Sequence, residues 1–160
     1  MYPQAKYFKE IIDSISKIVD EVALQITPQE VKIVAMDTAQ ISLLTITLPN
    51  TAFIEYDVED NVVVGLSTAS LSKMLKRIKK GDRFILNTVE DRVEVIIESV
   101  GKRIYKFRNL EVPVPEIPEA QLEFNVEAQL IVDTIKQAIK DAETVGDILE
   151  IEAPDEETLY

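Results

Sequence analysis

Carboxylates are the most numerous side chains in this sequence that could do chemistry, since 29 of its 160 residues are Asp or Glu. The run Asp155-Glu156-Glu157 could ligate a hard cation. A short run of like charges is more often a solvated surface, and we interpret it so. Asp57, Glu59 and Asp60 fall in an expected turn between strands, where acidic residues are ordinary. The carboxylates therefore predict no metal site.

The residue types that are missing exclude most enzyme mechanisms. Without Cys or His, the sequence cannot form disulfides or thiolate zinc sites, nor use Cys, Ser–His or imidazole catalysis. Its four glycines are scattered and form neither a phosphate-binding loop nor a dinucleotide fingerprint. No apolar run approaches the about 20 residues of a membrane span, and the N-terminus lacks a signal peptide's apolar core. We expect an intracellular protein that is not an enzyme and needs no cofactor.

Positive charge is concentrated locally although the net charge is −12. Lys73, Arg77 and Lys80 lie at spacings of four and three, so one helical face would carry all three. Such lysines are common on solvated helix faces, but they also attract nucleic-acid phosphates whatever the base sequence. Aromatic residues are not interleaved with them, which argues against base stacking on a single strand. Further basic residues on predicted helices are Lys9, Lys17, Lys76, Lys136 and Lys140.

Two helices are predicted in the first part of the chain. One spans residues 5–22, where Phe8, Ile12 and Ile15 recur at helical spacing. The other spans residues 68–80 and stops at Gly81. Both are amphipathic, so each should bury one face against a sheet.

Short runs rich in β-branched residues, bounded by turn signals, predict antiparallel strands around these helices. In one of them Leu44, Ile46 and Leu48 should share a face. Residues 1–110 are therefore expected to form an α+β domain with two helices. The predicted strands span residues 23–27, 31–36, 40–48, 53–58, 61–66, 83–89, 92–98 and 102–109.

A change in composition at Leu110 indicates a connection to a second domain. Residues 111–119 contain three prolines, and such a stretch is extended and cannot join a central sheet. After it we expect a strand at 122–126, a helix at 127–144 and a strand at 147–152. The buried face of that helix is predicted to contain Ile131, Ile135, Ala138, Ile139 and Ala142.

The third predicted helix repeats the first. Ile11-Ile12-Asp13-Ser14-Ile15 and Ile131-Val132-Asp133-Thr134-Ile135 match in residue type at a shift of 120, and a similar strand follows each. Two helices with Ile-rich faces can also resemble each other by chance. A duplicated domain is the interpretation we prefer, with the second copy incomplete in this sequence.

Three stretches in order resemble the DNA sliding clamps of the proliferating cell nuclear antigen family. Met36-Asp37-Thr38-Ala39-Gln40-Ile41-Ser42-Leu43 is similar to the family's Met-Asp-x-x-His-Val-Ser-Leu signature. Residues 70–76 resemble its second-helix motif, and residues 110–119 resemble its interdomain connector. The resemblance covers essentially the whole chain.

The resemblance implies a clamp-fold domain at 1–110, a connector at 111–122 and the start of a second clamp domain at 123–160. It also implies a ring of three subunits whose helices surround double-stranded DNA, with an acidic outer surface. The DNA-facing residues would then be Lys9, Lys17, Lys73, Lys76, Arg77, Lys80, Lys136 and Lys140.

In this family DNA polymerase, the clamp loader, flap endonuclease and DNA ligase dock short peptides in a pocket under the connector. The pocket positions here would be Met36, Gln40, Ile41, Leu43, Pro115, Ile117 and Pro118, and Gln40 departs from the commoner His. A subunit-interface edge is implied at Lys102, Arg103, Tyr105, Phe107 and Arg108. Its partner strand would follow Tyr160, so we expect this chain alone not to close a ring. A self-contained α+β interaction domain without DNA binding is the alternative.

Overall fold

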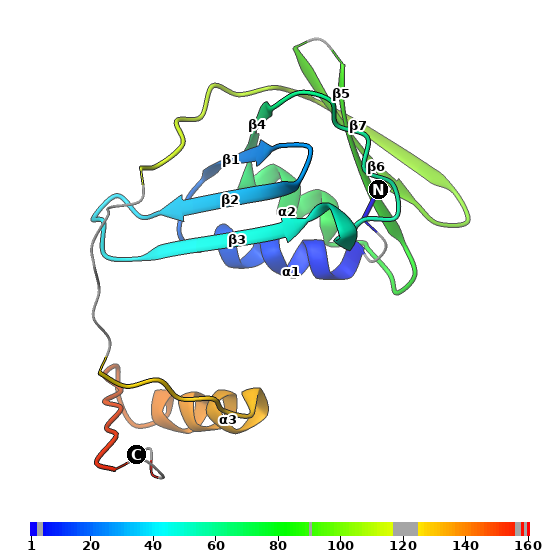
Figure 1. The fold of residues 1–160 in the computed structure, drawn as a ribbon. Helices are drawn as coiled ribbons and strands as arrows, with labels where there is room; N and C mark the ends of the chain where they lie inside the picture. The colour runs from blue at the N-terminus through cyan, green and yellow to red at the C-terminus, as the bar shows by residue number, and fades with distance from the viewer. Residues whose placement is uncertain (3–4, 90, 117–124, 156–157, 159) are drawn as a thin grey trace. The chain divides into compact units, whose positions relative to one another are not determined.

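A computed structural model describes residues 1–2, 5–89, 91–116, 125–155, 158 and 160 (Figure 1). The chain divides into two compact units, Met1–Ile117 and Pro118–Tyr160, which are considered separately below. In the described parts of the chain, no helix is long and apolar enough to cross a membrane.

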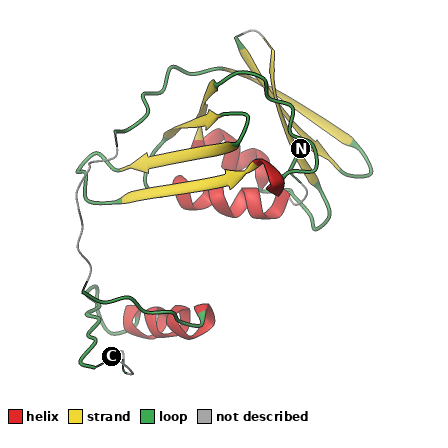
Figure 2. Ribbon diagram, viewed as in Figure 1, coloured by secondary structure: helices red, strands yellow, loops and turns green. Residues whose placement is uncertain are grey.

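The first unit has the predicted α+β class, with two antiparallel sheets and two helices (Figure 2). One sheet has the strand order β3-β2-β1-β4 and the other β5-β6-β7. The helices are α1 (Ala5–Ile15) and α2 (Thr68–Leu75), and a 3-10 turn covers Asn50–Ala52. The strands are β1 (Glu21–Ile26), β2 (Glu30–Met36), β3 (Leu43–Pro49), β4 (Val62–Ser67), β5 (Arg83–Val89), β6 (Arg92–Glu98) and β7 (Lys102–Arg108).

Both helices lie on the same face of the four-stranded sheet (Figure 1). Phe8, Ile12 and Ile15 of α1 are buried with Leu71 and Leu75 of α2 in the core. The Ser67 side chain caps α2 by accepting a bond from the Ser70 amide at 3.4 Å, as expected for a serine at this position. The apolar stripes of two separate helices therefore share one core.

The buried Thr68 side chain joins the start of α2 to the chain that follows α1. Its hydroxyl lies 2.9 Å from the carbonyl oxygens of both Val19 and Asp20. A hydroxyl with these partners can be buried at little cost, because its hydrogen bonding is satisfied.

The three-stranded sheet is joined to the helices through Asp82 and a pair of stacked rings. The carboxylate of Asp82, a buried residue, accepts bonds from the Lys79 amide at 3.1 Å and from the Arg103 guanidinium at 3.3 Å. Phe8 and Phe84 stack with ring centroids 3.9 Å apart, so α1 packs directly on β5. Burying Asp82 is tolerable because the charge is paired and hydrogen-bonded.

The outer face of the four-stranded sheet is partly covered by the start of the connector. Ala23 and Gly65 are register partners on β1 and β4. The Leu110 amide donates to the Gly65 carbonyl at 3.0 Å, and the Asn109 side chain accepts from the Gly65 amide at 2.8 Å. A Cβ on Gly65 would lie 2.0 Å from the Leu110 carbonyl oxygen, so only glycine allows this close approach.

The predicted alternation of side chains along β3 is confirmed, because Leu44, Ile46 and Leu48 pack on the core while the residues between them are exposed. The strand starts at Leu43, however, and not at Gln40. Strands β5, β6 and β7 match their predicted positions to within a residue.

Two predicted helices of the first unit are too long, and one predicted strand is absent. The first helix ends at Ile15 and not at residue 22, because the later apolar residues belong to a turn and to β1. The second ends at Leu75 and not at residue 80. Residues 53–58 form no strand, and their apolar side chains, Phe53, Tyr56 and Val58, pack on the core from irregular backbone.

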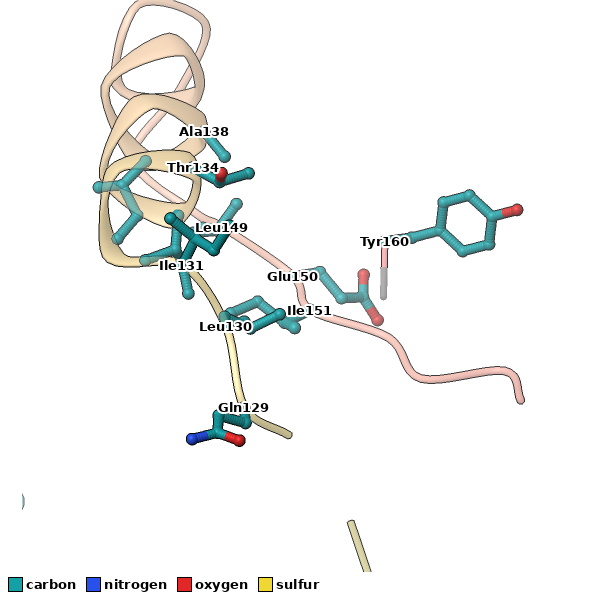
Figure 3. A pocket seen from close by; sticks show the side chains of 11 residues that line it. Gln129, Leu130, Ile131, Thr134, Ala138, Leu149, Glu150, Ile151 and Tyr160 are labelled. Atoms are coloured by element: carbon teal, nitrogen blue, oxygen red, sulfur yellow. The ribbon is translucent and has the colours of Figure 1, made fainter. Parts of the chain in front are cut away.

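In the second unit α3 (Val132–Glu143) starts later than the predicted residue 127. The predicted strand at 147–152 is absent, and that at 122–126 lies mostly outside the described residues. The predicted burial of the α3 stripe is also wrong: Ile131, Ala138 and Ile139 are exposed, while Ile135 and Ala142 are partly covered. No sheet covers α3 in the described part of this unit, and Leu149 and Ile151 lie beside it around a groove of about 430 Å³ (Figure 3).

Substituting Gly65 tests the contact between the connector and β4. Gly65→Ala should lower the free energy of unfolding by about 1–3 kcal/mol, because the added methyl collides with the backbone of Leu110. Gly101→Ala is the matched control, since nothing lies within 4 Å of a Cβ there. Urea denaturation of both variants measures the difference, and equal stability of the two would contradict the described packing.

Candidate functional site

The outer faces of α1 and α2 form one polar surface, because both helices bury their apolar sides against the same sheet. The segment from Thr68 to Gly81 contains no acidic residue. The structure places the predicted basic residues of this segment on its exposed side, together with one that the prediction did not include. These exposed residues are Lys73, Lys76, Arg77, Lys80 and the additional Lys79.

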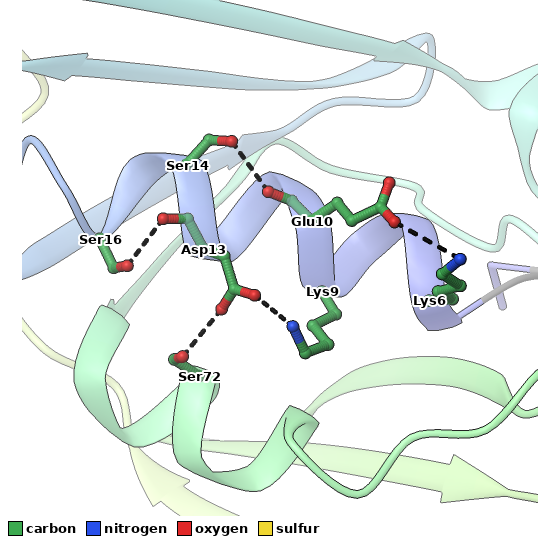
Figure 4. Close-up of polar contacts among 7 residues, drawn as sticks. All are labelled: Lys6, Lys9, Glu10, Asp13, Ser14, Ser16 and Ser72. Atoms are coloured by element: carbon green, nitrogen blue, oxygen red, sulfur yellow. Dashed lines mark hydrogen bonds and ion pairs between the residues drawn. The ribbon is translucent and has the colours of Figure 1, made fainter. Parts of the chain in front are cut away.

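Asp13 links the two helices at the edge of this surface (Figure 4). Its carboxylate forms an ion pair with Lys9 of the same helix and accepts a hydrogen bond from the Ser72 hydroxyl of α2 at 2.8 Å. The hydrogen bond from Lys9 lowers the pKa of Asp13 most, partial burial opposes it, and Ser72 and the charge of Lys76 lower it further. Lys9 is thus half-buried and paired, unlike the exposed Lys73 and Lys76.

The rest of α1 contributes little free positive charge. Lys6 lies 3.8 Å from Glu10 in a second ion pair of the same spacing (Figure 4). Lys17, which follows the helix, is exposed. The concentration of unopposed cations therefore lies on α2 and the residues directly after it.

Lys136 and Lys140 are exposed on α3 in the second unit. They share one helical face, since they are four residues apart. At the shift of 120 that aligns α3 with α1, they correspond to Ser16 and Asp20 and not to Lys9 or Lys17. The repeat thus preserves the apolar positions but not the lysines.

The turn between β2 and β3 is organised by Asp37. Its carboxylate accepts bonds from the Ser42 amide at 2.6 Å, the Ile41 amide at 2.8 Å and the Ala39 amide at 3.2 Å. These amides, that of Ser42 most, lower the pKa of Asp37. Gln40 within the turn has a φ of 56°, a left-handed conformation that polar residues adopt more readily than β-branched ones.

This turn holds Ile41 out into solvent. The Ile41 side chain is 85% exposed, and Leu43 at the start of β3 is 46% exposed. Met36 is half-buried at the end of β2, and Gln40 is exposed. Apolar side chains presented this way on a rigid turn are available to a partner.

The connector follows β7 in the chain and is hydrogen-bonded to β4 at Leu110. From there it runs above the four-stranded sheet toward the end where β2 terminates (Figure 1). Pro115 is half-buried in an extended segment. Ile117 and Pro118 lie outside the described residues. The structure thus describes five of the seven predicted pocket positions, Met36, Gln40, Ile41, Leu43 and Pro115.

Strand β7, the predicted subunit edge, is an outer strand of its sheet. Tyr105 and Phe107 pack on the core, and Arg103 points inward to Asp82. Lys102 and Arg108 are exposed. The outward backbone of β7 and its exposed basic residues are what the edge offers a neighbour.

Two polar residues that the sequence analysis missed, Asp13 and Asn109, hold these surfaces in place. The spacing of Lys9 and Asp13 by four residues could have indicated their ion pair. Nothing local indicates that Asn109 fixes the connector to β4. Across the described residues, no cluster of three metal-ligating side chains is found.

Comparison with known proteins agrees with this geometry. Residues 1–113 match the family model described as proliferating cell nuclear antigen, N-terminal domain. DNA polymerase sliding clamp 1 of Aeropyrum pernix is 40% identical over 154 residues, which cover 94% of this chain and 62% of that protein. DNA polymerase sliding clamp 1 of Sulfurisphaera tokodaii is 34% identical over 160 residues, 99% of this chain and 65% of that protein.

Two solved structures share the fold. The PCNA2–PCNA3 complex from Sulfolobus tokodaii superposes with a TM-score of 0.86 at 27% identity, covering 91% of this chain and 59% of that one. PCNA from Thermococcus kodakaraensis, at 23% identity, gives a TM-score of 0.88 and covers 99% and 69%. This chain spans less than two thirds of the length of the two sequence relatives. On the match of residues 1–113, the chain belongs to the proliferating cell nuclear antigen family.

Proposed function

We propose that this chain is part of a DNA sliding clamp, which holds replication and repair enzymes on double-stranded DNA. The observation that carries the proposal is the exposed cation cluster of α2 and the residues after it, Lys73, Lys76, Arg77, Lys79 and Lys80, on a chain of net charge −12. The relatives named as DNA polymerase sliding clamps support it. They also support a non-enzymatic role in the cytoplasm of an archaeal cell.

The charge pattern suits a protein that must slide on DNA. Lysines and arginines attract phosphates without reading bases, so the protein does not stop at particular sequences. Acidic residues over the rest of the surface repel DNA from other faces. Lys9 is restrained by Asp13, so we assign the main phosphate contacts to α2, with Lys17, Lys136 and Lys140 as further candidates.

For partner docking we propose the surface made by the β2–β3 turn and the connector. An aliphatic or aromatic anchor of a partner peptide would bury Ile41 and Leu43, whose exposure is otherwise unfavourable. Ile117 and Pro118 belong to this proposal by resemblance alone. DNA polymerase, clamp loader, flap endonuclease and DNA ligase are the partner classes it implies.

For assembly we propose a ring of three subunits with β7 as one side of each contact. The domain division at 1–110, 111–122 and 123–160 is part of the same proposal. One of the solved relatives is described as a complex of PCNA2 with PCNA3, so rings of unlike subunits are as compatible with this chain as rings of identical ones.

The first test concerns phosphate binding by α2. Lys73→Ala with Lys76→Ala should weaken association with duplex DNA equally for unrelated sequences, and the salt dependence should become shallower by about 0.9 for each phosphate that is no longer neutralised. Fluorescence anisotropy at several salt concentrations measures both. Lys32→Ala with Arg92→Ala is the matched control, because it removes the same charge from two strands. An unchanged slope in the first variant would place the DNA elsewhere.

The second test uses the ion pair at the helix seam. Asp13→Asn keeps an acceptor for Ser72 but releases Lys9, so DNA association should strengthen severalfold and its salt dependence should steepen. Asp91→Asn removes the same charge from the β5–β6 turn and should have little effect. If both variants respond alike, only net charge matters and Lys9 has no special position.

The third test addresses the docking surface. Ile41→Asp should abolish binding of a partner peptide with an apolar anchor, because the contact would bury an unpaired charge. Stability should change little, since Ile41 is already exposed. Val100→Asp, on another exposed turn, is the control. Calorimetry that gave the same affinity for the wild type and Ile41→Asp would move the surface elsewhere.

A further inference from the structure

The basic turn that follows α2 is held at both of its ends. Ile78 packs its side chain on the core, and its amide donates to the Leu75 carbonyl at 3.2 Å. At the other end, the amide of Asp82 donates to the Lys79 carbonyl at 3.2 Å. Between them Gly81 has a φ of 91°, a conformation that lets the chain reverse over a short distance. The course of this exposed turn therefore depends on contacts that lie at its two ends.

Asp82 bonds to three separate parts of the first unit. One oxygen of its carboxylate, Oδ2, accepts from the Lys79 amide at 3.1 Å and from the Arg103 guanidinium of β7 at 3.3 Å. Its carbonyl oxygen accepts from the amide of Ala5, the first residue of α1, at 2.9 Å. The Asp82 side chain is only 7% exposed. A carboxylate this buried must keep its partners, because a buried charge without them is costly.

Arg103 reaches the turn from a distant part of the sequence. It belongs to β7 and follows Asp82 by 21 residues. The alternation of side chains along β7 places Arg103 on the same face as Tyr105 and Phe107, which pack on the core. The guanidinium is 35% exposed and directed at the Asp82 carboxylate. The ion pair therefore ties the end of the turn to the outer strand of the three-stranded sheet.

We infer that Asp82, held by Arg103, positions Lys79 and Lys80 for contact with DNA phosphates, an inference that rests on the function proposed above for this surface. An exposed lysine side chain has many rotamers, so its place over a phosphate depends on where its backbone is held. The bond from the Lys79 amide to the Asp82 carboxylate holds that backbone at the first of the two lysines. Asp82 is itself buried, so it acts on DNA only through the turn.

The charge of Asp82 and its positioning role have opposite effects on DNA association. A carboxylate beside a cation cluster repels phosphates, so its removal strengthens association if only charge matters. If the carboxylate orders the turn, its removal also releases the two lysines, and association weakens. A role in folding alone lowers stability but does not make the salt dependence of the folded molecules shallower. The direction of the change therefore separates positioning from the other two roles.

The test uses Asp82→Ala in the full chain, with Asp91→Ala between β5 and β6 as a control of equal charge. Fluorescence anisotropy with duplex DNA at several salt concentrations should show severalfold weaker association for Asp82→Ala. Its salt dependence should become shallower by about 0.9 for each of the two lysines that leaves a phosphate. Asp91→Ala should bind as the wild type does or slightly more tightly. Association of Asp82→Ala that equals or exceeds that of Asp91→Ala would overturn the inference.

Amide hydrogen exchange tests the order of the turn without DNA. The Lys79 amide should exchange slowly for an exposed turn, because it donates to a buried carboxylate. Arg103→Gln should speed this exchange severalfold, and Arg103→Lys, which keeps a cation near Asp82, should restore part of the protection. The Leu110 amide, bonded to Gly65 on β4, is the internal reference and should not change. Equal exchange of the Lys79 amide in the wild type and in Arg103→Gln would also overturn the inference.

The variants distinguish a failure of this inference from a failure of the proposed function. If Lys73→Ala with Lys76→Ala changes the salt dependence while Asp82→Ala strengthens association, the DNA contact stands and the positioning role is rejected. If none of these variants changes the salt dependence, the DNA contact is wrong and the positioning role is rejected with it. Should Asp82→Ala not fold, Arg103→Gln replaces it. It should weaken DNA association more than Arg92→Gln, which removes the same charge from β6, and an equal effect of the two would overturn the inference.

Discussion

The burial of two amphipathic helices on one face of one sheet is the constraint on which the rest of this structure depends. Ile12 of α1 and Leu71 of α2 are fully buried in the same core, so the polar faces of both helices must point the same way. Lys73 of α2 and the basic residues directly after the helix can therefore act together instead of being spread over the surface. Asp13, paired with Lys9 and bonded to Ser72, fixes how the two polar faces meet.

The same layering determines where other molecules can bind. The helices cover the inner face of the four-stranded sheet, and the connector partly covers its outer face at Gly65. What remains accessible are the two ends of the sheet and the outer strands. Ile41 lies at one of these ends. The proposed contacts to DNA and to a docked peptide can thus coexist on one small domain.

Periodicity predicted most of this fold because burial is one-sided for β3 and for both helices of the first unit. It failed where apolar spacing continued across a boundary, as at Val22, which belongs to β1 and not to the first helix. It also failed at Phe53 and Tyr56, which are packed without a strand. For the candidate site, spacing predicted Lys73, Arg77 and Lys80 on one helical face, but α2 ends at Leu75, so only Lys73 lies on the helix. The attachment of Asn109 to β4 depends on strand register, which no local pattern carries.

The central claim is that duplex DNA lies against the paired helices and not against the outer sheet. Relaxation enhancement from a duplex carrying a nitroxide label measures this directly, since only amides near the DNA lose intensity. We expect losses along α1 and α2, greatest around Lys76, and none along β3. Losses along β3 or the connector, or no localised loss at all, would contradict the claim.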